Sequence, residues 1–198
     1  QIKIIDDNNL PSTAQLKLVK KDLDIGKVVT LNSATFKVKA REDIVSNGKI
    51  IYKAGEVIKQ KISGKVYDSF TTSANNTVVP SGSFNNDGDM GSVMLPLQLD
   101  VGRYFIYEIK TPTGYLSLEK PVDFIIENIR DYDKDQDCDP VLEVIIKNDK
   151  PIGQLKVFKS LESNIVDKSF INNNDLSKIK FRLTAKEDIL DVADGSII

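Results

Sequence analysis

Apolar and polar residues alternate along short runs of this chain, and this pattern constrains the fold more than any other feature. In residues 34–41, Phe36, Val38 and Ala40 share one face, while mostly charged side chains occupy the other. Side chains two residues apart in a strand point to the same side, so the run predicts a half-buried β-strand. No stretch longer than about ten residues keeps the apolar period of 3.6 that is typical of a helix.

Further runs of the same kind recur along the chain and are separated by residues that favour turns. The runs cover residues 15–20, 49–52, 92–95, 103–110, 121–127 and 141–148. Regularly spaced short strands with turns between them predict an all-β, antiparallel sandwich or barrel. Residues 66–83 are rich in Ser, Thr and Asn, and we expect them to form a long surface excursion.

The composition excludes several classes of function. The 198 residues include no histidine, which rules out Ser-His-Asp and Cys-His catalysis and every histidine-ligated metal site. Cys138 is the single cysteine, so no disulfide within the chain and no CxxC motif is possible. A formal net charge of −2 gives no electrostatic footprint for nucleic acid. No run approaches the roughly 18 apolar residues of a membrane span, so we expect no membrane insertion in this segment.

The chain contains an internal repeat. Residues 36–44 return as residues 181–189, at a distance of 145 residues, and residues 15–20 return as residues 154–159, at a distance of 139. Charged and turn residues recur in order along with the apolar ones, as they do where the turn at residues 46–48 matches residues 193–195. Such a period indicates a tandem array of similar domains.

The repeat predicts how the chain is divided. Residues 1–12 would form the last strand of a preceding repeat and a linker, and residues 13–150 one complete domain. Residues 151–198 would form the N-terminal part of a second, truncated repeat. About a third of a sandwich cannot bury its own core, so the sequence leaves open whether this part folds.

Three polar residues stand at the ends of apolar rows. Lys20 shares a face with Leu16 and Leu18, Glu108 shares one with Tyr104 and Ile106, and Asn148 shares one with Leu142, Val144 and Ile146. If the three rows face one core, then Lys20, Glu108 and Asn148 meet at one edge of it. The alternative is that each row ends at the rim, where its last side chain reaches water.

Three segments resemble the Cna protein B-type domains of Gram-positive surface adhesins and pilins. Residues 102–115 (Gly-Arg-Tyr-Phe-Ile-Tyr-Glu-Ile-Lys-Thr-Pro-Thr-Gly-Tyr) are similar to that family's Glu-containing segment. Residues 16–22 (Leu-Lys-Leu-Val-Lys-Lys-Asp) resemble its first strand, and residues 148–151 (Asn-Asp-Lys-Pro) resemble its last. The middle, from about residue 54 to residue 89, is longer than is usual in the family. The resemblance implies an antiparallel, Ig-like (prealbumin-like) β-sandwich.

The resemblance also implies an intramolecular isopeptide bond, with Lys20 as the nucleophile, Asn148 as the acyl donor and Glu108 as the proton shuttle. The chemistry is coherent, because burial among apolar side chains lowers the pKa of a lysine and leaves the amine neutral and reactive. A protonated glutamic acid can polarise the asparagine carbonyl and pass a proton to the departing ammonia. The reaction takes place once in each molecule, so the chain is not expected to be an enzyme with turnover, and it needs no cofactor.

In the second repeat, Lys159 is the counterpart of Lys20. The acceptor of the preceding repeat would be Asp7, Asn8 or Asn9, and the offsets of the repeat do not select one of them. The resemblance therefore implies a structural stalk or shaft repeat of a cell-surface adhesin or pilus. Such a protein is extracellular and anchored to the cell wall elsewhere in the chain, and its partners are neighbouring repeats of the same protein.

A second hypothesis is a ligand-binding adhesive module that contacts a host extracellular ligand, through residues 66–83 or an acidic tip, with or without calcium. The tip carries five carboxylates at alternate positions from Asp131 to Asp139, and Ca²⁺ takes several oxygen ligands. It lacks the glycine and the last glutamate of an EF-hand, which favours a solvated hairpin tip. Asp133, Asp135 and Asp137 are the weak metal candidates.

Overall fold

The computed structural model describes residues 13–86, 88–127, 141–158 and 179–198, and within these ranges the protein is all-β, with no helix. The strands are β1 (Thr13–Asp22), β2 (Thr35–Ala40), β3 (Ile44–Ser46), β4 (Lys49–Tyr52), β5 (Gln60–Ile62), β6 (Lys65–Tyr67), β7 (Ser69–Thr71), β8 (Ser83–Phe84), β9 (Ser92–Met94), β10 (Leu99–Asp100), β11 (Gly102–Lys110), β12 (Val122–Ile126) and β13 (Val141–Asn148). All the alternating runs that the sequence marks as strands are strands here.

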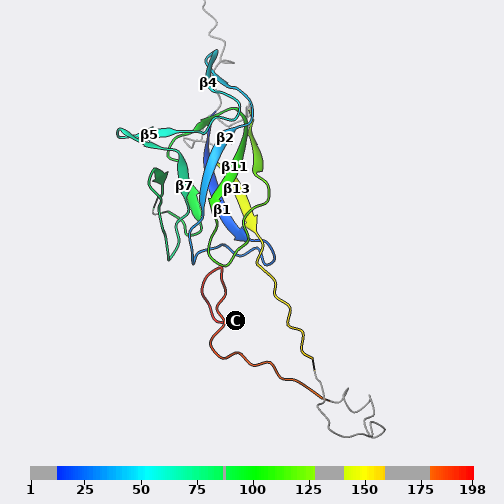
Figure 1. The fold of residues 1–198 in the computed structure, drawn as a ribbon. Helices are drawn as coiled ribbons and strands as arrows, with labels where there is room; N and C mark the ends of the chain where they lie inside the picture. Colours follow the sequence, from blue (N-terminus) through cyan, green and yellow to red (C-terminus); the bar gives the residue numbers. More distant parts are fainter. Residues whose placement is uncertain (1–12, 87, 128–140, 159–178) are drawn as a thin grey trace, which may run out of the picture.

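Two sheets face each other across one core, as the predicted β-sandwich requires (Figure 1). The first sheet has the order β10-β1-β13, and β9 also pairs with β1. The second has the order β12-β11-β2-β7-β8, and the separate hairpins β3-β4 and β5-β6 extend beyond the two layers (Figure 1). Most neighbouring strands are antiparallel, but β1 pairs with β13 and β7 pairs with β8 in parallel.

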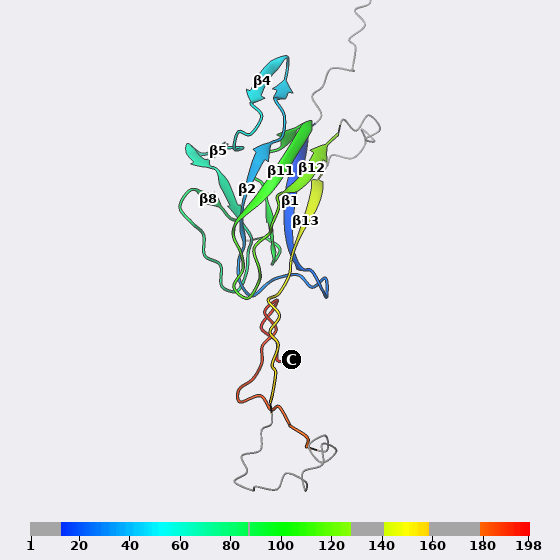
Figure 2. The ribbon, with the colours of Figure 1, turned by 45° about the vertical axis from the view of Figure 1, so that its right-hand side comes forward.

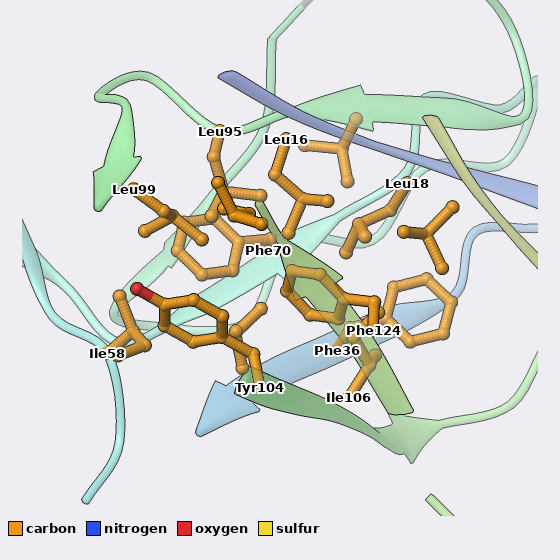
Figure 3. Packing of buried hydrophobic residues seen from close by; sticks show 14 of the residues in the cluster. Leu16, Leu18, Phe36, Ile58, Phe70, Leu95, Leu99, Tyr104, Ile106 and Phe124 are labelled. Carbon is orange, nitrogen blue, oxygen red and sulfur yellow. The ribbon is translucent and has the colours of Figure 1, made fainter. Parts of the chain in front are cut away.

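The core forms where the apolar faces of the two sheets meet (Figure 3). Leu16 and Leu18 of β1 are fully buried against Phe36 of β2 and Ile106 of β11, and the ring of Tyr104 stacks on that of Phe124 at 5.3 Å. Each fully buried side chain of this size contributes about 1.5–3 kcal/mol to stability. The alternation that the sequence shows is therefore the pattern of core-facing residues.

The chain enters the sandwich at one end and leaves it at the other. Strand β1 starts at the end of the molecule that carries the β3-β4 hairpin, and β13 ends at the opposite end, where residues 151–158 continue away from it (Figures 1 and 2). Because β1 and β13 are parallel neighbours along eight residue pairs, from Gln15–Val141 to Asp22–Asn148, a pull on the two ends loads this pair in shear.

The expectation of a long surface excursion over residues 66–83 is wrong for its first half. Strand β7 lies there next to β2 in the second sheet, and Phe70 is fully buried in the core. The hydroxyl of Thr71 lies 3.0 Å from that of Thr35 and 2.7 Å from that of Ser83. The polar residues that suggested a surface loop thus satisfy one another inside the sheet, while Val78, further along, remains exposed.

Residues 151–158 and 179–188 contain no strand, although part of this region repeats the sequence of β1 and β2. Leu155 is 69% exposed and Leu183 is 84% exposed. By contrast, residues 189–198 form a short hairpin, in which Leu190 bridges Ile197, and this hairpin lies against the sandwich. The division at residues 12 and 150 remains a prediction.

Candidate crosslinking site

Lys20 lies inside the molecule although it is charged in its ordinary state. It is the last core-facing residue but one of β1, and its side chain has no exposed surface. The Lys20 Nζ donates to the carbonyl oxygens of Ile146, at 3.3 Å, and of Lys21, at 3.4 Å. It also lies 5.7 Å from the centre of the Tyr115 ring. The bond to Ile146 places the amine beside β13, two residues before Asn148.

Asn148 is positioned by the parallel register of β1 and β13. It pairs with Asp22, while Lys20 pairs with Ile146, so Lys20 and Asn148 are diagonal neighbours on the core-facing side of one sheet. Asn148 is 2% exposed, and its backbone carbonyl accepts a hydrogen bond from the Leu23 N–H at 2.9 Å. The end of β13 is therefore fixed against the end of β1.

Glu108 reaches the same place from the second sheet. It lies on β11 opposite Phe36 of β2, and the register shifts immediately after it, between Glu108 and Lys110. The Glu108 Oε2 accepts hydrogen bonds from Asn148 Nδ2 at 2.6 Å, from Thr111 Oγ1 at 3.0 Å and from the Leu118 N–H at 3.3 Å. Glu108 and Asn148, predicted to meet at one edge of the core, are thus in direct contact.

Two oxygens of this contact are buried and have no partner. Among the residues that the structure describes, neither Glu108 Oε1 nor Asn148 Oδ1 receives a hydrogen bond. A buried acceptor without a donor costs about 1–3 kcal/mol. The contact between Glu108 and Asn148 is therefore not a fully satisfied pair of side chains.

The surroundings of Lys20 favour its neutral form. Burial lowers the pKa of Lys20 to about 8, although the negative charges of Glu108 and Asp22 oppose this shift. At pH 7, a lysine with that pKa is neutral in about a tenth of the molecules, against less than a thousandth for an ordinary lysine. An amine nucleophile must be neutral to attack, so the site holds Lys20 close to its reactive state.

Asp22, Tyr115 and Lys150 also form part of this site, although no role is predicted for them from the sequence. The Asp22 carboxylate is fully buried and accepts hydrogen bonds from Tyr115 Oη at 2.9 Å and from the N–H groups of Asp24 and Ile25, and it pairs with Lys150 Nζ at 2.9 Å. Burial acts to raise the pKa of Asp22, but these donors outweigh it and hold the pKa below its ordinary value.

The two carboxyl groups of the site therefore differ. Both oxygens of Asp22 are occupied by donors, which keeps it an anion, while one oxygen of Glu108 is free among the described residues. Parity could have identified Asp22, because it continues the face of Leu18 and Lys20.

Several other sequence-based candidates cannot be placed. Lys159, the carboxylates Asp133, Asp135 and Asp137, Cys138 and the acceptor candidates Asp7, Asn8 and Asn9 lie outside the described residues. Within the described ranges, no cluster of three or more side chains suited to a metal ion is present. The same ranges contain no helix with the length and apolar character needed to cross a membrane.

Comparison with known proteins yields distant likenesses in fold. No family model and no curated protein matches the chain. Among solved structures, the chain is similar to GBS52, the minor pilin of Streptococcus agalactiae, with 20% identity and a TM-score of 0.44. It is also similar to the major pilin SpaD of Corynebacterium diphtheriae (22%, TM-score 0.44) and to the group B streptococcus pilus 2b backbone protein (17%, TM-score 0.43).

These matches cover 76%, 72% and 69% of this chain, but only 50%, 32% and 41% of the respective pilins. The chain thus spans half or less of the length of each. All three are pilus proteins. Because the identities are about 20% and the TM-scores are below 0.5, the role of this chain has to be argued from its own side chains.

Proposed function

We propose that this chain is a structural stalk or shaft segment of a cell-surface adhesin or pilus, in which an isopeptide bond between Lys20 and Asn148 locks the complete sandwich. One observation carries the proposal: Asn148 Nδ2 lies 2.6 Å from Glu108 Oε2, and the buried Lys20 amine donates to the Ile146 carbonyl, two residues before Asn148 on the same strand. An ion pair that only stabilises the fold requires a lysine and a carboxylate. Amide exchange requires a carboxamide at the same edge of the core as well.

The reaction exchanges one amide for another. The neutral Lys20 Nζ attacks Asn148 Cγ, the Nζ–Cγ bond forms, and the Cγ–Nδ2 bond breaks. Nζ gives up one proton and Nδ2 takes one up, so that ammonia leaves and no oxidant or cofactor is required. Folding brings the groups together, which supplies the high effective concentration that an intramolecular reaction enjoys.

Glu108 is suited to carry the proton between the two nitrogens. Its Oε2 already faces Asn148 Nδ2, the atom that must be protonated before it can leave. The bonds from Thr111 and Leu118 hold the carboxyl group in this position. In its protonated form, Glu108 polarises the amide; after the attack it gives its proton to the leaving nitrogen and, as a carboxylate, takes one from Nζ, so that it ends in the form in which it began.

The bond would determine how the domain carries load. Force that enters through β1 would cross from Lys20 to Asn148 and leave through the end of β13, without passing through residues 21–147. The parallel pairing of β1 with β13 brings the two ends of this path together. A segment built in this way transmits force without extending, which is the property that a stalk between a cell surface and an adhesive tip needs. Its partners in that role are neighbouring repeats of an extracellular, wall-anchored protein.

Pulling on single molecules from the two ends tests this function. In the wild-type chain, residues 21–147 should contribute no unfolding step, whereas in Asn148→Ala they should add a step of roughly 400 Å, at about 3.3–3.6 Å per residue. Asn75→Ala removes an exposed asparagine side chain and should behave like the wild type. The long step in wild-type molecules would overturn the proposal.

A further inference from the structure

The hairpin at residues 189–198 contacts the end of the sandwich from which the chain leaves (Figures 1 and 2). We call these ten residues the docking hairpin, and we call residues 27–31 together with Gly114 the basal surface. The hairpin has its own bonds: the Ile198 N–H donates to the Ile189 carbonyl at 2.9 Å, and the Asp191 N–H donates to the Ser196 carbonyl at 2.7 Å. It therefore meets the basal surface as a formed element.

Ala193, at the tip of the docking hairpin, makes the central contact. Its carbonyl oxygen accepts two hydrogen bonds from the basal surface, from the Thr30 N–H at 2.7 Å and from the Leu31 N–H at 2.9 Å. Ala193 is completely buried, whereas Ala185, eight residues earlier, is exposed. Ala193 is thus buried and also bound through two backbone hydrogen bonds, as is typical of two surfaces that are complementary in shape.

Two glycines allow the surfaces to approach closely. A Cβ atom on Gly114 of the basal surface would lie 2.7 Å from Val192 Cγ1, and one on Gly195 of the hairpin would lie 3.2 Å from Leu31 Cδ1. Both glycines have positive φ values, of 91° and 80°. Glycine is therefore needed here for its conformation as well as for its size.

Charge complements this fit. Lys27 of the basal surface pairs with Asp194 and, at 3.2 Å, with Asp191, so one lysine bridges both ends of the hairpin turn. The pairs are partly shielded, because the side chain of Asp191 is only 14% exposed. The turn is held by its own aspartates, since Asp191 Oδ1 accepts from the Ala193 N–H at 2.9 Å.

The β3-β4 hairpin is the counterpart of the docking hairpin in the internal repeat, where residues 46–48 match residues 193–195. It lies at the opposite end of the sandwich (Figure 2). Val45, which precedes its turn as Val192 precedes Ala193, is 53% exposed there. The β3-β4 hairpin at one end of the sandwich is thus the counterpart of the docking hairpin that contacts the other end.

From these contacts, we infer that residues 189–198 are a docking element, by which one repeat seats on the basal surface of the repeat before it and fixes the orientation of the two. The partner of the basal surface is therefore the following repeat of the same chain. The inference rests on the tandem-repeat part of the proposed function and not on the crosslink.

Amide hydrogen exchange at Thr30 and Leu31 in the full chain tests the inference. Docking protects these two amides through Ala193, so Ala193→Arg, which cannot fit a fully buried site, should accelerate their exchange by about tenfold or more. Ala185→Arg makes the same change at an exposed alanine of the same segment and should leave the exchange unchanged. Equal exchange in the wild type and both variants would overturn the inference.

A second pair of variants covers the case in which Ala193→Arg merely disrupts the hairpin. Lys27→Glu reverses the charge on the basal surface and leaves residues 189–198 untouched, and it should also accelerate exchange at Thr30 and Leu31. Lys53→Glu, at an exposed position between β4 and β5, should not. The intact mass of each sample reports the crosslink separately, so loss of docking with the crosslink retained, or the reverse, shows which proposal has failed.

Discussion

Residues 15–17 and residues 154–156 have the same sequence, Gln-Leu-Lys, but they differ in burial and in secondary structure. In the first copy, Leu16 is fully buried in a ten-residue strand. In the second copy, Leu155 is 69% exposed and no strand forms. The first copy has β9, β10 and β13 as neighbours, and the second has no strand beside it among the described residues. Alternation thus creates a face that is able to be buried, and the partner strands decide whether a buried site forms.

Limited trypsin digestion should reveal the largest difference between the two copies. Lys17 lies within β1 and is cleaved only after the sandwich opens, while Lys156 lies in an exposed, irregular segment. We expect cleavage after Lys156 to be faster by about a thousandfold or more, since local openings cost far less than global unfolding. Comparable rates at Lys17 and Lys156 would mean that the contrast between the copies is false.

Removing the crosslink should lower the stability of the sandwich that contains the first copy, and so reduce its contrast with the second copy. Asn148→Ala prevents the isopeptide bond, and the loop-entropy model for a crosslink that closes a loop of this size predicts a loss of roughly 4–5 kcal/mol in the free energy of unfolding. Chemical denaturation measures the loss. Asn75→Ala, at an exposed position, should change the free energy by no more than about 0.5 kcal/mol. A similar small change in Asn148→Ala would argue against a crosslink.

The same variant should show a pH dependence that the wild type lacks. In Asn148→Ala, Lys20 remains an amine, with a folded-state pKa of about 8 against 10.5 when unfolded. Between these pH values the unfolded state binds more protons, so stability should rise as the pH increases from about 8 to 10.5, by about 1–3 kcal/mol. In a wild-type chain with the proposed crosslink, Lys20 would be an amide nitrogen and would not titrate. Parallel pH profiles of the two proteins would contradict this assignment.

The smallest expected effect concerns the docking hairpin, which, unlike residues 154–156, contacts the sandwich. The bond from Lys27 lowers the pKa of Asp194 to about 2. A depressed pKa means that this contribution to docking is present above the ordinary value of 3.8 and is lost as the pH falls toward 2. The NMR shifts of the Thr30 and Leu31 amides should follow that loss, and Asp194→Asn should remove the pH dependence.

Much of the fold and the centre of the candidate site could be predicted from local pattern. Period-two alternation identified the long strands, and the same parity placed Lys20, Glu108 and Asn148 at the ends of apolar rows. The same parity places Asp22 on the core-facing side of β1. The four donors that bind its carboxylate come from residues 24, 25, 115 and 150, and no local sequence pattern predicts them.

Local sequence patterns could not predict the pairing between segments that lie far apart in the sequence. The hydroxyls of Thr35, Thr71 and Ser83 satisfy one another across the sheet, so a segment that looks like a surface loop contains a buried strand. The docking contact is equally non-local, because the Ala193 carbonyl is bound by amides of residues 30 and 31, more than 160 residues earlier.

The intact mass of the folded wild-type chain tests the central claim most directly. Formation of the Lys20–Asn148 bond releases ammonia, so the mass should lie about 17 Da below that of the sequence. Glu108→Gln, which removes the proton shuttle, should restore the full mass, and Glu143→Gln, at an exposed position of β13, should retain the loss of about 17 Da. Full mass in well-folded wild-type protein would contradict the account.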